Sequence, residues 1–258
     1  MKPLFPILFL FFSFVWVGAS ASSPLEEEPA FSYSVANESY RNGDFAKAAD
    51  EYQRIIDAGW ASADLYFNMG NACQKLHRRA EAILYYERAL RLRPNDEDIR
   101  YNLEWVSSQV KEPTETLPEL FIVRWAHSLR NLLPEQGWAV LVIVCLLLLL
   151  GTVWGYLFLQ QRFLKKASFS LSVLFASMLV VSVIAGSSRK AWMNNRTEAV
   201  VKTEKLTVYS APDQNSTQLF LIFEGIRVNI LDQVGDWREI RLPDGNKGWI
   251  RVSDILVI

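Results

Sequence analysis

The chain has 258 residues, of which 50% are hydrophobic and 21% are charged, and its formal net charge is −1. This length accommodates two small domains besides any membrane segment, and so balanced a charge gives no reason to expect a nucleic acid as a partner. The only two cysteines are Cys73 and Cys145. Because Cys145 lies in a long apolar run and Cys73 in a helical pattern, we expect no disulfide between them.

The N-terminus has the pattern of a signal peptide. A short charged start precedes an apolar run over residues 4–17, and Ala19-Ser20-Ala21 then offers small residues for cleavage. We therefore predict a signal peptide over residues 1–21, followed by an unstructured acidic leader over residues 22–30. The alternative is an uncleaved signal anchor, which would give the chain three spans and place its N-terminal and C-terminal domains on opposite sides of a membrane.

Residues 31–110 contain a helical pattern that repeats. Four positions recur at one constant spacing: Ala36 as Gly70, Asn37 as Asn71, Ala48 as Ala82 and Tyr52 as Tyr86. This spacing is the tetratricopeptide period, in which small residues let paired helices approach and aromatic rings fill the gaps. We predict two repeats and a capping helix that begins after Asn95 or Asp96. So short a solenoid is marginal, and we expect docking to another protein or to a second copy to stabilise it.

The resemblance to tetratricopeptide repeats implies a concave groove lined by the first helix of each repeat. In the family's register, the lining residues are Tyr33, Asn37, Tyr40, Asp64, Phe67, Asn71, Gln74, Asp98, Tyr101 and Trp105. Aromatic rings and side-chain amides suit an extended peptide, because rings supply contact area and amides form hydrogen bonds with backbone groups. The alternative is that several of these rings pack against neighbours within the chain. Chaperone-binding members clamp a terminal carboxylate with basic residues, which are replaced here by Tyr33, Asp98 and Asn102, so we expect no carboxylate clamp.

Two apolar runs without a charged residue follow, over residues 138–159 and 167–186. As a helix, the first would be about 33 Å long, enough to cross a hydrocarbon core of about 30 Å. We predict a transmembrane hairpin with a basic turn over residues 160–166 and a linker over residues 187–196. A linker and an amphipathic segment at the membrane surface are predicted over residues 111–137, with Trp125 at headgroup level.

The charges next to the apolar runs predict the orientation of the hairpin. The turn carries Arg162, Lys165 and Lys166, and short cytoplasmic loops are enriched in such residues. The turn is therefore expected inside and both flanks outside, which agrees with a cleaved signal peptide. Arg189, Lys190 and Arg196, after the second run, argue for the opposite orientation, and the signal peptide weighs against them.

Residues 197–258 show a period of two, as in Leu206 and Val208, with turn-forming clusters between short segments. The pattern predicts a small β-barrel. Gly-Asp-Trp at residues 235–237 and Asp-Gly-Asn-Lys-Gly-Trp at residues 244–249 resemble a bacterial SH3-type domain. The resemblance implies an SH3-like β-barrel in which Trp237 and Trp249 belong to the framework, and it raises peptidoglycan as a ligand.

We find no motif of a catalytic or cofactor site. The sequence has no nucleophile elbow, no zinc-protease motif and no phosphate loop, and Cys73 with His77 provides only two metal ligands. We therefore expect that the protein is not an enzyme and uses no cofactor or metal. The expected fold is multidomain α and β: a tetratricopeptide α-solenoid, a two-helix transmembrane hairpin and the C-terminal SH3-like β-barrel.

The order of these parts resembles the BatE-type proteins of the Bacteroides aerotolerance (Bat) operon over the whole mature chain. The resemblance implies a protein of the bacterial inner membrane whose repeats and C-terminal domain face the periplasm. It also implies von Willebrand A-type Bat membrane proteins as partners, a MoxR-type AAA+ ATPase on the cytoplasmic side, and a role in oxidative or envelope stress tolerance. We therefore expect a scaffold that contacts membrane lipid and binds protein partners in its groove; the alternative is a peptidoglycan-binding module.

Overall fold

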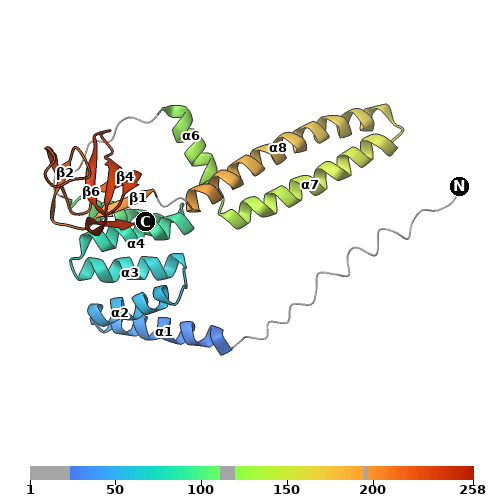
Figure 1. Ribbon diagram of the computed structural model, residues 1–258. Coiled ribbons are helices and arrows are strands. Elements are labelled where there is room, and N and C mark those ends of the chain that lie inside the picture. The colour runs from blue at the N-terminus through green and yellow to red at the C-terminus, as the bar shows by residue number, and fades with distance from the viewer. Residues whose placement is uncertain (1–23, 111–119, 195–196) are drawn as a thin grey trace.

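The computed structural model describes residues 24–110, 120–194 and 197–258. It shows a stack of helices, a long helical hairpin and a C-terminal β-sheet (Figure 1). The predicted signal peptide at residues 1–21 and residues 111–119 of the predicted linker and surface segment lie outside the described residues.

Five helices form the N-terminal stack: α1 (Pro24–Arg41), α2 (Phe45–Asp57), α3 (Ala63–Lys75), α4 (Arg79–Leu92) and α5 (Glu97–Ser107). The side chains of Asp44 and Ser62 cap α2 and α3 by accepting hydrogen bonds from backbone N–H groups. Asp96 caps α5 in the same way, which is one of the two caps predicted from the sequence. Gly43, with φ +83°, makes the tight turn between α1 and α2.

The first helix begins earlier than predicted. α1 starts at Pro24, so the segment predicted as an unstructured leader over residues 22–30 is helical from Pro24 onward. A proline at the first helical position and glutamates in the first turn favour a helix start. The first N–H groups of a helix have no intrahelical partner, so a proline there costs no hydrogen bond. Acidic residues in the first turn complement the helix dipole.

A glycine sets the distance between the two helices of the second repeat. A Cβ at Gly70 would lie 2.7 Å from two ring atoms of Tyr86, which is itself fully buried in α4. The aromatic ring can occupy this crossing only because the position opposite it has no side chain. In the first repeat Ala36 and Tyr52 take the corresponding places, and both are buried.

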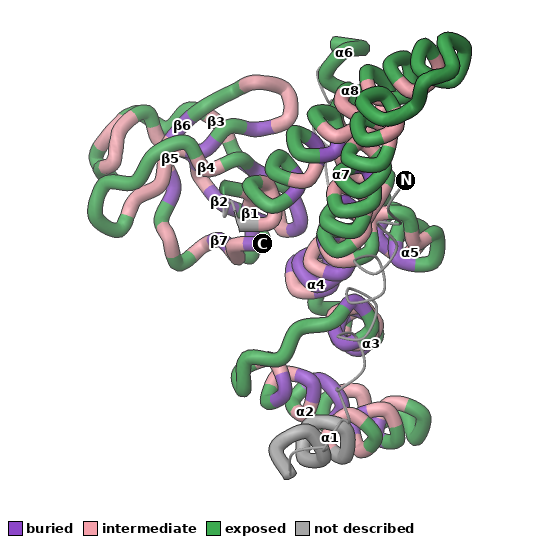
Figure 2. Tube along the Cα trace, turned by 90° about the vertical axis from the view of Figure 1, so that its right-hand side faces the viewer, coloured by how far each residue is buried: buried purple, intermediate pink, exposed green. Residues whose placement is uncertain are grey.

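Three helices follow the stack: α6 (Phe121–Arg130), α7 (Glu135–Phe158) and α8 (Arg162–Asn194). α7 and α8 pack side by side as a hairpin and are long and apolar enough, by length and composition, to cross a membrane (Figure 1). Most of their residues are exposed in the isolated chain (Figure 2). Small residues line their contact, since a Cβ at Gly155 would meet Ser168 and one at Gly186 would meet Trp138.

Two boundaries of this hairpin differ from the prediction. The predicted basic turn over residues 160–166 is shorter, because α8 already starts at Arg162. The predicted linker over residues 187–196 is helical through Asn194. The helix continues because Arg189 is fully buried against the helical stack, which holds the end of α8 in place.

The C-terminal region is a seven-stranded antiparallel sheet with the strand order β3-β2-β6-β5-β4-β1-β7. Its strands are β1 (Glu198–Val201), β2 (Lys205–Tyr209), β3 (Gln218–Phe223), β4 (Arg227–Val234), β5 (Trp237–Arg241), β6 (Lys247–Arg251) and β7 (Ile255–Val257). Trp237, predicted to be framework, is half-buried and makes an edge contact with Tyr209. Gly248 lies where any Cβ would overlap Val208 of the neighbouring strand β2.

The prediction of a closed barrel is wrong for this sheet. Within the described residues, no strand ladder joins the edge strands β3 and β7. β7 pairs with β1 on one side and contacts α4 of the helical stack. An edge strand can be protected by pairing or by a covering helix, and here the helix takes the place of barrel closure.

The sheet packs on α4 of the helical stack. Gly225 lies so close to Ile83 of α4 and to Val110 that an added Cβ would be 3.1 Å and 2.8 Å from their side chains. Buried residues of both parts form one continuous core. The sheet therefore covers α4, whereas Tyr101 and Trp105 of the capping helix α5 stay exposed.

Both ends of α4 are capped by other parts of the molecule. Its own N-cap residue, Arg78, makes no side-chain capping bond, and the carboxylate of Glu224 in the sheet domain accepts from the Ala80 N–H at 3.1 Å. At the other end, the guanidinium of Arg189 in α8 donates to the Arg91 carbonyl oxygen. A carboxylate at the start and a cation at the end both complement the helix dipole. The central helix therefore joins the sheet to the hairpin.

Candidate functional site

All ten predicted lining residues lie on the first helices of the repeats or on the capping helix, α1, α3 and α5. The structure shows which of them keep groups free for a ligand. In the first repeat, the Tyr52 hydroxyl donates to Asn37 Oδ1 at 2.6 Å, and the Asn68 amide donates to the same oxygen at 3.1 Å. Asn68 also donates to the Tyr33 hydroxyl at 2.8 Å. The carbonyl oxygen of Asn37 is thus used within the chain.

The second repeat contains the same bond at the equivalent positions. The Tyr86 hydroxyl lies 2.7 Å from Asn71 Oδ1 and 2.6 Å from Gln74 Oε1. Burial raises the pKa of both Tyr52 and Tyr86, so these hydroxyls remain protonated donors at any physiological pH. The predicted asparagines therefore connect the two helices of each repeat, and their carbonyl oxygens are used within the chain.

The aromatic positions follow the same repeat. The rings of Tyr33 and Tyr52 lie 6.0 Å apart, and those of Phe67 and Tyr86 lie 5.9 Å apart. Tyr40 makes an edge contact with Phe45 at 5.2 Å. These rings pack within the chain, which was the alternative that the sequence left open for them.

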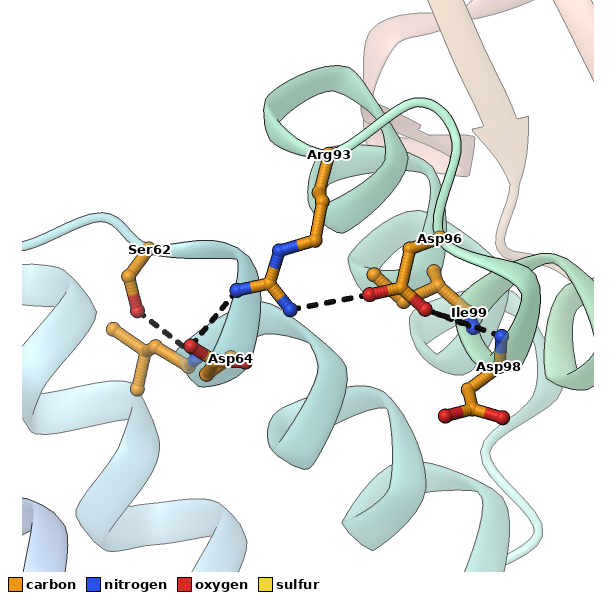
Figure 3. A network of polar contacts seen from close by, with 7 residues as sticks. Ser62, Asp64, Arg93, Asp96, Asp98 and Ile99 are labelled. Atoms are coloured by element: carbon orange, nitrogen blue, oxygen red, sulfur yellow. Dashed lines mark hydrogen bonds and ion pairs between the residues drawn. The ribbon is translucent and has the colours of Figure 1, made fainter. Parts of the chain in front are cut away.

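Asp64 is tied to an ion-pair bridge at one end of the groove. The Arg93 guanidinium donates to Asp64 at 2.9 Å and to Asp96 at 3.1 Å, so it connects the start of α3 with the start of α5 (Figure 3). Burial alone would raise the pKa of Asp96, but hydrogen bonds from the Ile99 N–H and from Arg93 more than offset this and lower it. This arrangement fixes the capping helix, and the Asp64 carboxylate is already paired within the chain.

The capping helix is different because it has no second helix to cover it. Tyr101 and Trp105 stand one repeat after Phe67 and Asn71, yet their side chains are 67% and 47% exposed. Asp98, one turn earlier, is also exposed. An aromatic pair left open on a rigid helix is the kind of surface that anchors protein partners.

A cavity of about 290 Å³ adjoins Trp105 at the end of the groove that the capping helix α5 forms. It is lined by Gln74, Lys75, His77, Arg79, Trp105, Val106 and Gln109. Most lining groups are polar donors, and two of them are cations. The cavity and the exposed ring together offer both an apolar contact and hydrogen-bond donors to an extended chain.

Sequence reasoning missed the residues that hold the three parts together. Arg91 of α4 donates to Glu198 of β1 at 2.9 Å and to the Ile258 carbonyl oxygen at 3.1 Å. Arg189 donates to Asn131 at 3.0 Å. The only signal in the sequence was the position of Arg189 directly after an apolar run, which we considered solely as evidence on orientation.

Comparison with known families agrees with the two domain types. The tetratricopeptide repeat family matches residues 63–96, which are the second repeat and the approach to the capping helix. The bacterial SH3 domain family matches residues 204–255, which comprise β2 to the start of β7. No curated protein matches the chain in a sequence search.

Proposed function

We propose that this chain is a membrane-anchored scaffold that binds a protein partner at the open end of its repeat groove. The observation that carries the proposal is the exposure of Tyr101 and Trp105 in a groove whose other rings and asparagines are used internally. The similarity to tetratricopeptide repeats supports protein binding as the general role. The anchor is the hairpin of α7 and α8, with both flanking domains on the outer side of a bacterial inner membrane.

The wider setting that we propose is a Bat-type complex linked to oxidative or envelope stress tolerance, with von Willebrand A-type membrane proteins as partners. The same proposal assigns the chain no catalytic role. Its support is the order of the parts: repeats, surface helix, hairpin and SH3-like domain.

The test is affinity purification of the full chain in mild detergent, with its companions identified by mass spectrometry. The double variant Tyr101→Ala/Trp105→Ala removes two exposed rings, so it should fold normally and lose the companions. Trp60→Ala is the matched control, because Trp60 is 46% exposed but lies on the loop between α2 and α3. Companions retained by the double variant would refute groove binding, and companions without von Willebrand A domains would refute the Bat-type setting.

A second candidate function is binding of cell-wall peptidoglycan by the sheet domain. The similarity to bacterial SH3 domains supports it, and β3 is an edge strand with exposed Leu219 and Leu221. An extended wall peptide could pair with such an edge. This function predicts that the full chain in detergent sediments with purified wall material and that Leu219→Lys/Leu221→Lys does not.

A further inference from the structure

A second and larger cavity lies where all parts of the molecule meet. Its volume is about 890 Å³, and its walls come from α4, α6, the end of α8 and the sheet. Arg124, Arg130, Arg227 and Arg241 line it, together with the side-chain carboxylates of Glu87 and Glu198. We call it the junction cleft.

The two carboxylates of the junction cleft are already paired. Glu87 accepts from Arg227, and Glu198 accepts from Arg91 at 2.9 Å. Among the described residues, Arg124, Arg130 and Arg241 make no ion pair. Three arginines of the cleft wall therefore lack a carboxylate in direct contact, although Glu198 acts on Arg130 from a longer distance.

Arg130 and two further arginines converge on the ring of Trp192. The guanidinium carbons of Arg130, Arg189 and Arg91 lie 4.6, 5.0 and 5.3 Å from the centre of the Trp192 ring. The indole attracts each cation, but the cations repel one another. Burial lowers the pKa of Arg130, and the charge of Glu198 offsets only part of this effect. An anion in the cleft would relieve both the repulsion and the effect of burial.

The position of α6 indicates where such an anion comes from. Arg124, His127 and Arg130 recur every three residues on the side of α6 that lines the cleft. Phe121 and Trp125 on its other side are 79% and 67% exposed. α6 leaves the base of the hairpin and runs across the direction of α7 and α8 (Figure 1). In a membrane, the cleft would therefore lie at the level of the lipid headgroups.

We propose that the junction cleft binds the phosphate of an anionic phospholipid headgroup. The proposal rests on the membrane anchoring proposed above. Arginine forks match phosphate oxygens in geometry as well as in charge, and Arg124 and Arg241 are exposed enough to reach a headgroup. The acyl chains would remain in the bilayer beside Phe121 and Trp125. Basic sites next to spanning helices are typical places for such recognition.

The test measures binding of short-chain phosphatidylglycerol and phosphatidylcholine to the full chain in a non-ionic detergent. The double variant Arg124→Gln/Arg241→Gln removes two unpaired cations. Its control, Lys205→Gln/Lys247→Gln, removes two exposed cations of the sheet that do not line the cleft. We expect phosphatidylglycerol to bind and phosphatidylcholine not to bind. The cleft variant should lose affinity about thirtyfold, since each interfacial cation contributes about 1 kcal/mol, whereas the control should lose little.

Three outcomes would overturn the proposal. They are equal binding of both lipids, equal losses in the two double variants, and inorganic phosphate binding as tightly as phosphatidylglycerol, which would make free phosphate the ligand. Flotation of the wild-type chain with vesicles tests anchoring separately. A chain that floats but binds no anionic headgroup refutes only the cleft, whereas a chain that does not float refutes the membrane anchoring.

Discussion

The packing of the sheet on the helical stack makes a sharp prediction at Gly225. Its φ of +90° is unfavourable for any residue with a side chain, and an added Cβ would lie 2.8 Å from Val110 Cγ2 and 3.1 Å from Ile83 Cδ1. Gly225→Ala should therefore combine backbone strain of about 1–2 kcal/mol with overpacking of about 1–3 kcal/mol.

The chain offers a nearly ideal control for the backbone term. Gly59 has a φ of +89°, and nothing lies within 4 Å of a Cβ added there. Gly59→Ala should therefore show only the backbone strain. The difference between the two variants, about 1–3 kcal/mol, measures the contact between the sheet and the helices.

The measurement is amide hydrogen exchange on the full chain in detergent, followed in peptides from α4 and β1. Gly225→Ala should lower the protection of these peptides. This loss should be about 5-fold to 150-fold larger than the largest loss that Gly59→Ala causes in any segment. Val110→Ala should partly rescue Gly225→Ala, because it removes the nearer methyl group. Equal effects of both glycine variants, or no rescue, would refute the packing of the sheet on the stack.

Three further predictions concern the helices. Gly70→Ala should destabilise the second repeat by about 1–3 kcal/mol in thermal unfolding, because Tyr86 is held by its hydroxyl bonds and cannot move aside; an unchanged melting temperature would contradict this. Because the pKa of Asp96 is below its usual 3.8 in the folded chain, its cap should stabilise α5 fully above about pH 4 and weaken as the pH falls further; Asp96→Asn should abolish this dependence in exchange measurements. Burial raises the pKa of the Cys73 thiol to about 12, so iodoacetamide at pH 8 should modify it only after unfolding, and fast labelling of the native chain would contradict its burial.

Much of the helical part could be predicted because its signals are local. The constant spacing of equivalent positions located the repeats, and the caps of α2 and α5 follow from single side chains next to them. The roles of the asparagines were harder to predict. Asn71 can bond either to a ligand or to Tyr86, and only the relative position of the Asn71 and Tyr86 side chains decides which bond forms. The exposure of Tyr101 likewise depends on the absence of a covering helix.

Apart from the charge of Arg189 directly after an apolar run, the contacts between distant parts had no signal in the sequence. Glu224 caps α4 although it lies far along the chain from Ala80, and no pattern in the sequence marks such a pair. The barrel prediction was wrong for the same reason. The edge strand β7 contacts α4 of a distant part of the chain, and the pattern of the strands does not indicate this contact. The end of α8 was predicted too early because Arg189 is charged, although this charge is what binds the helix to the end of α4.

The most direct test of partner binding is site-specific photocrosslinking in intact cells. A photoreactive residue would replace Tyr101 in one variant and Trp60, as the control, in another. We predict that position 101 crosslinks to a separate protein and that position 60 does not, because only the first lies on the open end of the groove. Crosslinks from position 101 only to the chain itself, or equally from both positions, would contradict the proposal that this groove is the partner site.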